Sequence, residues 1–144
     1  MADRSLAYYG LGVRSPGSSP AIVEEIEEAS GRLEALTLFG CGLTSLGGLP
    51  PLRHLTSLAL GSNALGPDLG AVFPEAAVWA RSLTFLDVSG NDLTSLRCAG
   101  TFPALRSLDA SENRLPSLDG LGAACPALVS LDVHNEGQAF RVVE

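Results

Sequence analysis

LTFLDVSGNDL, residues 83–93, is one of five copies of an eleven-residue pattern in this chain of 144 residues. The copies begin at Leu33, Leu55, Leu83, Leu105 and Leu128, so the steps between them are 22, 28, 22 and 23 residues. Each copy is apolar at positions one, four and six, and position nine is cysteine in the first copy and asparagine in the next three. Because three of the chain's four asparagines share one position of the pattern, we infer a repeat architecture.

The alternation of residues that face the core and the solvent at positions three to six predicts a short strand in each copy. One such strand cannot bury its apolar side alone, so the copies are expected to stack as a parallel sheet. The asparagine at position nine is expected to be buried, with its amide bonding backbone groups where the strand ends. Cys41 offers only a weak donor at that position, and Ala110 at position six predicts looser packing.

The pattern resembles the leucine-rich repeat, LxxLxLxx(N/C)xL. This resemblance implies an α/β fold, a right-handed solenoid whose curved parallel sheet lines the concave face. We predict a single domain over residues 1–144, with an N-terminal repeat and helix at 1–32, five repeats at 33–138 and a C-terminal end at 139–144. In the N-terminal repeat, Leu6 is placed at position one and Tyr9 at position four, so that Tyr8 faces outward.

Two of the segments between the predicted strands favour helices. A helix is expected at residues 20–29, because Ser19 and Pro20 suit a helix start and the apolar residues that follow recur with helical spacing. A shorter helix is expected at residues 73–80, with Trp79 packed on the convex side. The other connections contain proline and are expected to be irregular or 3₁₀.

The two ends of the predicted sheet need a cover, because an open sheet edge exposes unpaired backbone groups. Phe140, Val142 and Val143 are the candidates for the C-terminal cover. No capping helix precedes Leu6, so the chain is expected to be a monomer or to associate weakly end to end.

A narrower resemblance lies in two stretches, GLTSLGGLPPLRHLTSLALGSNALGPDLG at residues 42–70 and SLTFLDVSGNDL at residues 82–93. They are similar to the acidic leucine-rich nuclear phosphoprotein family, whose repeats are of the intracellular 22-residue type. The regulatory repeats of protein phosphatase 1 and the dynein light-chain repeats are the next candidates. Membership implies a non-enzymatic adaptor, histone binder or phosphatase inhibitor in the nucleus or cytoplasm. The family's histone binding depends on a long acidic tail, which residues 1–144 do not contain.

The charge and composition of the chain exclude several functions. The formal net charge is −7 at pH 7, so nucleic acid and membranes are poor partners. All nine basic residues are arginine, and without lysine there is neither a P-loop phosphate site nor Schiff-base chemistry. Cys41, Cys98 and Cys125 lack the spacing of a disulfide framework or a metal site, and we expect no cofactor. The absence of a signal peptide and of a long apolar segment favours an intracellular location.

The candidate binding surface is a row of aspartates. Outward residues of stacked strands form columns, so position five is expected to place three carboxylates side by side, those of Asp87, Asp109 and Asp132. Glu112 flanks this row, and Phe85 at position three is expected to face solvent beside it. We interpret the row as a surface for arginine or lysine of a partner, although the aspartates alternatively serve only solubility. The same face supplies five further candidate contacts: Thr37, Phe39, Ser107, Ser130 and His134.

These observations favour a protein-interaction module that binds another protein, one of basic character, on its concave face. The alternative is a regulatory or inhibitory subunit of a Ser/Thr phosphatase, which rests on the family resemblance alone. A structural subunit held through its ends is a further alternative. An enzyme is disfavoured, because His54 has no catalytic partner at motif spacing and an exposed surface explains the charged neighbours of His134.

Overall fold

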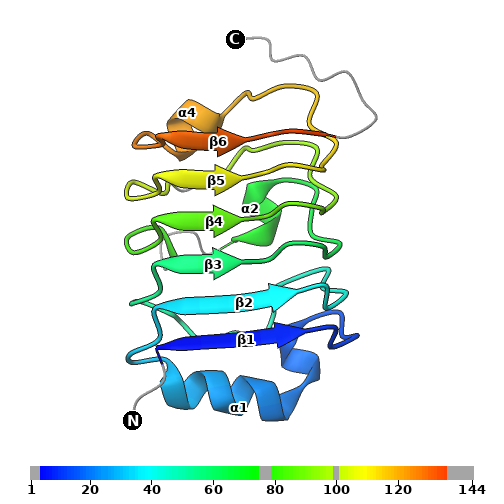
Figure 1. The fold of residues 1–144 in the computed structure, drawn as a ribbon, viewed down its shortest axis with the longest axis vertical. Helices are drawn as coiled ribbons and strands as arrows, with labels where there is room; N and C mark the ends of the chain where they lie inside the picture. The colour runs from blue at the N-terminus through cyan, green and yellow to red at the C-terminus, as the bar shows by residue number, and fades with distance from the viewer. Residues whose placement is uncertain (1–3, 75–78, 99–100, 136–144) are drawn as a thin grey trace.

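Six parallel strands form one sheet in the computed structural model, which describes residues 4–74, 79–98 and 101–135. The strands follow one another in chain order, and each pairs only with its neighbours in the sequence of strands (Figure 1). They are β1 (Ser5–Tyr9), β2 (Ala35–Phe39), β3 (Ser57–Ala59), β4 (Phe85–Asp87), β5 (Ser107–Asp109) and β6 (Ser130–Asp132).

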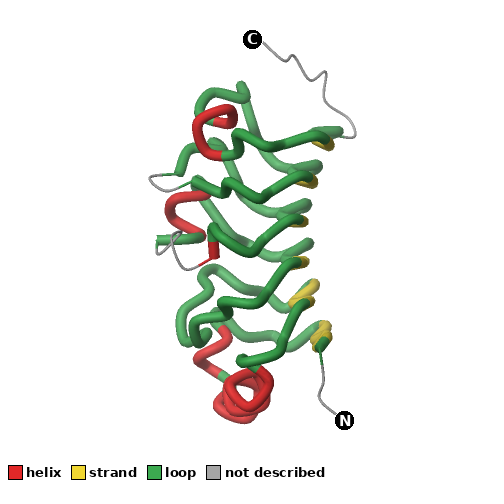
Figure 2. Tube along the Cα trace, turned by 90° about the vertical axis from the view of Figure 1, so that its left-hand side faces the viewer, coloured by secondary structure: helices red, strands yellow, loops and turns green. Residues whose placement is uncertain are grey.

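The chain winds as a right-handed solenoid, running along each strand at the front of Figure 1 and returning behind it. In Figure 2 the strands form one side of the molecule, and the row of strands is bowed toward the helices in its middle. The outer side of the sheet is therefore the concave face. This arrangement confirms the predicted α/β solenoid with its parallel sheet on the concave side.

A long helix covers the N-terminal end of the solenoid. After the 3₁₀ turn η1 (Pro16–Ser18), helix α1 (Pro20–Ala29) lies beneath β1 (Figure 1). Ile26 of α1 is fully buried, and the Tyr8 hydroxyl of β1 donates a hydrogen bond to Glu25 of α1. The helix at residues 20–29 is confirmed. The expectation of an uncapped N-terminal end was wrong, because the cover follows the first strand instead of preceding it.

Among the described residues, two short helices, α2 (Leu69–Val72) and α4 (Leu121–Ala124), lie on the convex side. Helix α2 begins after Asp68, whose Oδ1 accepts a hydrogen bond of 2.7 Å from the Ala71 N–H. The long repeat therefore turns helical before residue 73, and residues 75–78 of the predicted helix lie outside the described residues. Trp79 is buried with its ring against that of Phe73, as expected.

The expectation that the other connections are irregular or 3₁₀ was wrong for the last one described. It contains the one-turn helix α4 (Leu121–Ala124), which follows Gly120 at φ +88°. At the C-terminal end, the predicted cover by Phe140, Val142 and Val143 lies outside the described residues.

The core is a single column of leucines between the sheet and the returning segments. Leu58 and Leu86, at position four, are fully buried, as is Leu60 at position six. Burying each such side chain stabilises the fold by about 1.5–3 kcal/mol. Ala110 is buried at the same position as Leu60, and the looser packing around it stays a prediction.

Buried asparagines connect neighbouring repeats. Asn91 and Asn113 are 6% and 5% exposed, and each bonds backbone groups of its own and the preceding repeat. Asn63 makes the same bonds in a half-buried setting. Cys41 occupies the equivalent place, and its Sγ lies 3.6 Å from the Tyr8 carbonyl oxygen and 3.4 Å from that of Phe39. The bonding role expected of the asparagines is confirmed, although Asn63 is half-buried, and the weaker tie at Cys41 stays a prediction.

The register of the first repeat differs from the prediction by three residues. Leu6 pairs with Leu36 at position four, and Tyr8 pairs with Leu38 at position six. Tyr8 therefore packs against the core and is half-buried, so its predicted outward position was wrong. The backbone turn at position eight confirms the observed register, which places Gly10 at that position. A positive φ occurs there in five repeats: Gly10 (62°), Gly40 (61°), Ser62 (57°), Gly90 (61°) and Glu112 (53°).

Candidate functional site

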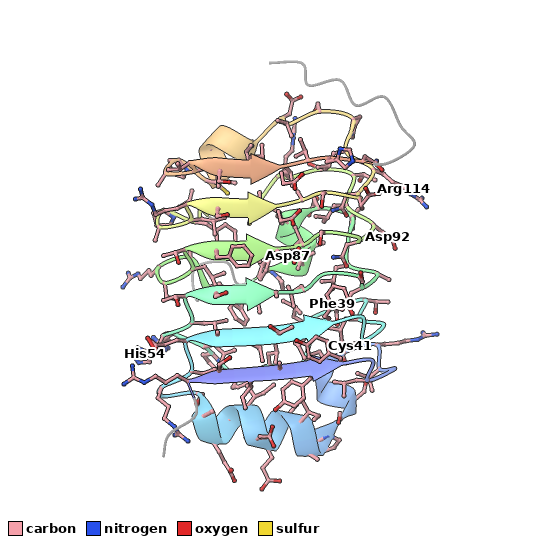
Figure 3. All side chains as sticks on the ribbon, viewed as in Figure 1. Phe39, Cys41, His54, Asp87, Asp92 and Arg114 are labelled. Carbon is pink, nitrogen blue, oxygen red and sulfur yellow. The ribbon has the colours of Figure 1, made fainter. Side chains whose placement is uncertain are left out.

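Three aspartates form a row across the C-terminal half of the concave face. Asp87 on β4 is paired in register with Asp109 on β5, which is paired with Asp132 on β6. Figure 3 shows Asp87 on the front of the sheet, away from the helices. We call Asp87, Asp109 and Asp132 the acidic row. Its members lie side by side as expected from the repeat, whereas their role in binding stays a prediction.

Each carboxylate of the acidic row also closes a backbone turn. Its Oδ1 accepts a hydrogen bond from the N–H two residues ahead, at 2.8 Å from Ser89, 3.0 Å from Ser111 and 2.9 Å from His134. The N–H groups on either side of Ser89 and Ser111 donate instead to the next strand. Sequence reasoning missed this structural role, because it considered only charge at the outward positions.

The acidic row is not neutralised within the described residues. None of its three carboxylates forms an ion pair there, and no arginine occupies an outward position of a described strand. Asp132 is exposed, and Asp87 and Asp109 are half-buried. The exposed Glu112 follows β5, and its N–H donates 2.8 Å to the carbonyl oxygen of His134. The face therefore presents negative charge over β4–β6.

Ser107 and Ser130 lie beside the acidic row at position three of β5 and β6. Phe85, at the same position of β4, is 36% exposed, so its expected place beside the row is correct. Thr37 is half-buried at position five of β2, two strands away from Asp87. The structure thus places these candidates on one face but separates Thr37 from the acidic row.

Two aromatic side chains occupy the other half of the concave face. The rings of Tyr9 and Phe39 lie 6.3 Å apart, and these residues are 66% and 42% exposed. We call them the aromatic pair. Phe39 contacts the backbone of Gly61 on the neighbouring turn, where an added Cβ would lie 3.0 Å from its ring. Tyr9 was missed as a candidate, because the three-residue register error assigned it to the core.

The family model described as Leucine Rich repeat matches residues 52–68 and 80–96, and these segments contain or lead into β3 and β4. The chain is a leucine-rich repeat protein. No solved structure matches it at a significant level.

This leucine-rich repeat protein is similar to curated proteins of the predicted family. Acidic leucine-rich nuclear phosphoprotein 32-related protein 2 of Caenorhabditis elegans is 37% identical over 94 residues, covering 64% of this chain and 41% of the relative. The related protein 1 of the same organism is 40% identical over 88 residues, covering 60% and 37%. Mouse platelet glycoprotein Ib alpha chain is 44% identical over 76 residues, covering 53% and 10%. The chain therefore spans less than half the length of these relatives.

The convex side of this leucine-rich repeat protein has a cavity of about 300 Å³. Leu46, Leu49, Val72 and Trp79 line it, together with the polar side chain of Ser45. Within residues 4–74, 79–98 and 101–135, no cluster of three histidine, cysteine or acidic side chains has the arrangement of a metal site. No helix in the same part of the chain could cross a membrane.

Cys125 has a thiol with a shifted pKa. It is 3% exposed, and burial raises the pKa of its thiol from an ordinary 9.0 to about 11, with a smaller contribution from Cys98. Above pH 9 the unfolded chain ionises this thiol, while the folded chain keeps the proton. The folded state therefore loses stability as the pH rises from 9 toward 11.

We expect a Cys125→Ala variant to lose this part of the pH dependence. Urea unfolding at pH 8 and pH 10.5 measures it, because the difference between the two pH values should be smaller in the variant than in the wild type. An equal difference in both proteins would show that Cys125 is not protected from ionisation in the fold.

Proposed function

We propose that this protein is a non-enzymatic interaction module, an adaptor or regulator acting in the nucleus, that binds an arginine- or lysine-rich segment of another protein on its concave face. The acidic row carries this proposal, because three carboxylates in register lie on a face where no outward position of a described strand holds arginine. The nuclear location is supported by the names of the two Caenorhabditis elegans relatives, which are related to nuclear phosphoproteins.

Electrostatics favours a basic occupant. Neighbouring strands lie about 4.8 Å apart, so adjacent carboxylates of the acidic row repel each other by about 1 kcal/mol in water. A guanidinium or ammonium group placed between two of them removes this repulsion and makes charge-assisted hydrogen bonds. Because Oδ1 of each aspartate is engaged in a turn, the partner is expected to bind chiefly through Oδ2.

The test is affinity capture from an extract of the source cells with a triple variant, Asp87→Asn, Asp109→Asn and Asp132→Asn. Asparagine keeps the Oδ1 acceptor of each turn and removes only the charge, so the fold is expected to persist. We expect about a tenfold or greater loss of the captured basic partner, which corresponds to about 1.4 kcal/mol. Wild-type capture should weaken as salt is raised, whereas the residual capture by the variant should not.

The matched control removes three charges elsewhere, with Glu24→Gln, Glu28→Gln and Asp119→Asn at exposed positions outside the strands. This variant has the same net charge as the triple asparagine variant, and its capture should equal that of the wild type. Equal recovery of partners by the wild type and the acidic-row variant would contradict the proposal. If the wild type captured a phosphatase catalytic subunit and the acidic-row variant did not, the partner would be identified as a phosphatase.

A further inference from the structure

We infer that the aromatic pair, Tyr9 and Phe39, is an anchor site for a large apolar side chain of the same basic segment. This inference rests on the proposed function and adds a sequence requirement for the partner. The segment would carry an apolar residue three to six positions from its first basic residues. Binding would then need both halves of the concave face, the aromatic half and the acidic half.

Exposure of apolar side chains is concentrated on this face. Within the described residues, the exposed large apolar side chains are Tyr9, Phe39, Phe85 and Val129, and the first three lie at outward strand positions of the concave face. Exposed aromatic residues that cluster on one surface are typical of binding hot spots. In the part of the chain that the structure describes, the aromatic pair is the one place where two exposed rings lie in contact.

The surroundings of the aromatic pair are small and uncharged. The outward positions of β1–β3 and of the turns that follow hold no ionisable side chain except the Tyr9 phenol; they are Ser5, Ala7, Tyr9, Ala35, Thr37, Phe39, Ser57, Ala59 and Gly61. Gly61 is buried beside the Phe39 ring, and an added Cβ there would lie 3.0 Å from this ring and 3.1 Å from Ser89 Oγ. The exposed parts of the Tyr9 and Phe39 rings are the surface that a partner side chain can reach, and an apolar side chain suits these uncharged surroundings.

The order of the strands sets the spacing between the two halves. Phe39 lies on β2, Asp87 two strands further on β4, and Asp132 four strands further on β6. At about 4.8 Å per strand, the row begins about 10 Å and ends about 19 Å from the aromatic pair. An extended segment that crosses the strands advances about 3.3 Å per residue, so three to six residues span these distances. This arithmetic gives the spacing required of the partner.

The experiment uses three labelled peptides of equal length and charge, measured by fluorescence anisotropy. The first has tryptophan, three Gly-Ser spacer residues and then three arginines; the second replaces tryptophan with serine; and the third separates tryptophan from the arginines by ten residues. We expect the first peptide to bind the wild type about tenfold more tightly than the other two. All three should bind more weakly when salt is raised.

The protein variants separate the two halves. A Tyr9→Ser, Phe39→Ser variant, and Tyr9→Ser alone as a milder change, should lower affinity for the first peptide toward that of the second. Binding of the second peptide, which has serine in place of tryptophan, should not change. Val129→Ser is the matched control, since Val129 is 74% exposed but lies outside the outward positions of β6, and it should have no effect. Thermal unfolding checks that each variant is folded.

The outcomes distinguish the two proposals. If tryptophan adds no affinity, or its effect persists in Tyr9→Ser, Phe39→Ser, the anchor site is wrong while a salt-dependent arginine contribution still supports the proposed function. If no arginine peptide binds in a manner that depends on the acidic row, the proposed function fails and the anchor inference fails with it. A third peptide as tight as the first would contradict the required spacing.

Discussion

An Asn91→Ala variant is expected to lower the free energy of unfolding by about 4 kcal/mol, because it removes four hydrogen bonds and leaves the Leu65 N–H without its acceptor. The Asn91 Nδ2 donates at 3.0 Å to the Leu60 carbonyl oxygen, at 2.9 Å to that of Val88 and at 3.0 Å to that of Ser89. Its Oδ1 accepts from the Leu65 N–H at 3.0 Å. The carbonyl oxygens of Leu60, Val88 and Ser89 each keep a second donor, so each bond lost there costs about 0.5–1.5 kcal/mol. The Leu65 N–H is left unpaired, which costs about 1–3 kcal/mol. Urea unfolding followed by circular dichroism measures the loss.

Cysteine at the same position is the informative comparison. Cys41 shows that a thiol can lie within bonding distance of carbonyl oxygens in this slot, so Asn91→Cys should be less destabilised than Asn91→Ala. Asp92→Ala, at the exposed neighbouring residue, should change stability by less than about 0.5 kcal/mol. One hydrogen bond contributes on the order of 1 kcal/mol to the free energy of unfolding. If the free energies of unfolding of Asn91→Ala and the wild type differed by less than about 1 kcal/mol, the bonding role assigned to the asparagines would be contradicted.

A Gly48→Ala variant is expected to be destabilised by about 3 kcal/mol, because the added methyl group has no space and the backbone conformation disfavours it. Gly48 has a φ of +92°, and a Cβ there would lie 2.4 Å from Gly17 Cα and 2.7 Å from Gly17 N. These are backbone atoms, and the Gly17 N–H donates 2.8 Å to the Gly47 carbonyl oxygen. Relief of the clash would therefore disturb the link between the first turn and the next repeat. Thermal or urea unfolding measures the effect.

The adjacent residue supplies the control for this substitution. A Cβ at Gly47 would find its nearest neighbour, Ser45 Oγ, at 3.4 Å, an ordinary contact. Gly47→Ala should therefore cost less than about 1 kcal/mol. If the two alanine variants had equal free energies of unfolding, residues 16–18 would be able to move away from the added methyl group without loss of stability. The close approach of Gly48 to Gly17 would then not limit the side chain at residue 48.

The five later repeats were predictable from sequence, because two independent signals fix their register. Leucine at positions one and four marks the buried side of each strand, and the asparagines mark the end of the strand. Asp87, Asp109 and Asp132 could therefore be placed in one row before any coordinates were available, and the observed pairing agrees. What sequence could not supply is the turn that each of these side chains closes, since this depends on backbone direction after the strand.

The first repeat was placed wrongly for a physical reason. Leu6 and Tyr9 imitate the leucine spacing, but Leu11 stands where later repeats have asparagine or cysteine. The reliable marker was Gly10, which takes the positive φ shared by position eight. Glycine at that position is frequent but not constant, as Ser62 and Glu112 show, so leucine spacing outweighed it. Because of this error, Tyr9 was predicted to face the core and was not considered as a binding residue.

The helices were predicted less well than the strands. The amphipathic spacing at residues 20–29 identified α1, whereas α2 and α4 have only four residues each. Four residues do not complete a second turn, so apolar periodicity carries no information about them. Asp68, which accepts from the Ala71 N–H at the start of α2, was the usable signal for that helix.

The asparagine bonds reach only from one turn to its neighbours. Asn91 bonds the repeat before it, and Asn113 in turn bonds the repeat of Asn91. No strand of this sheet joins the first turn to the last. The molecule can therefore open from its ends while the middle stays folded, and local fraying need not lead to global collapse.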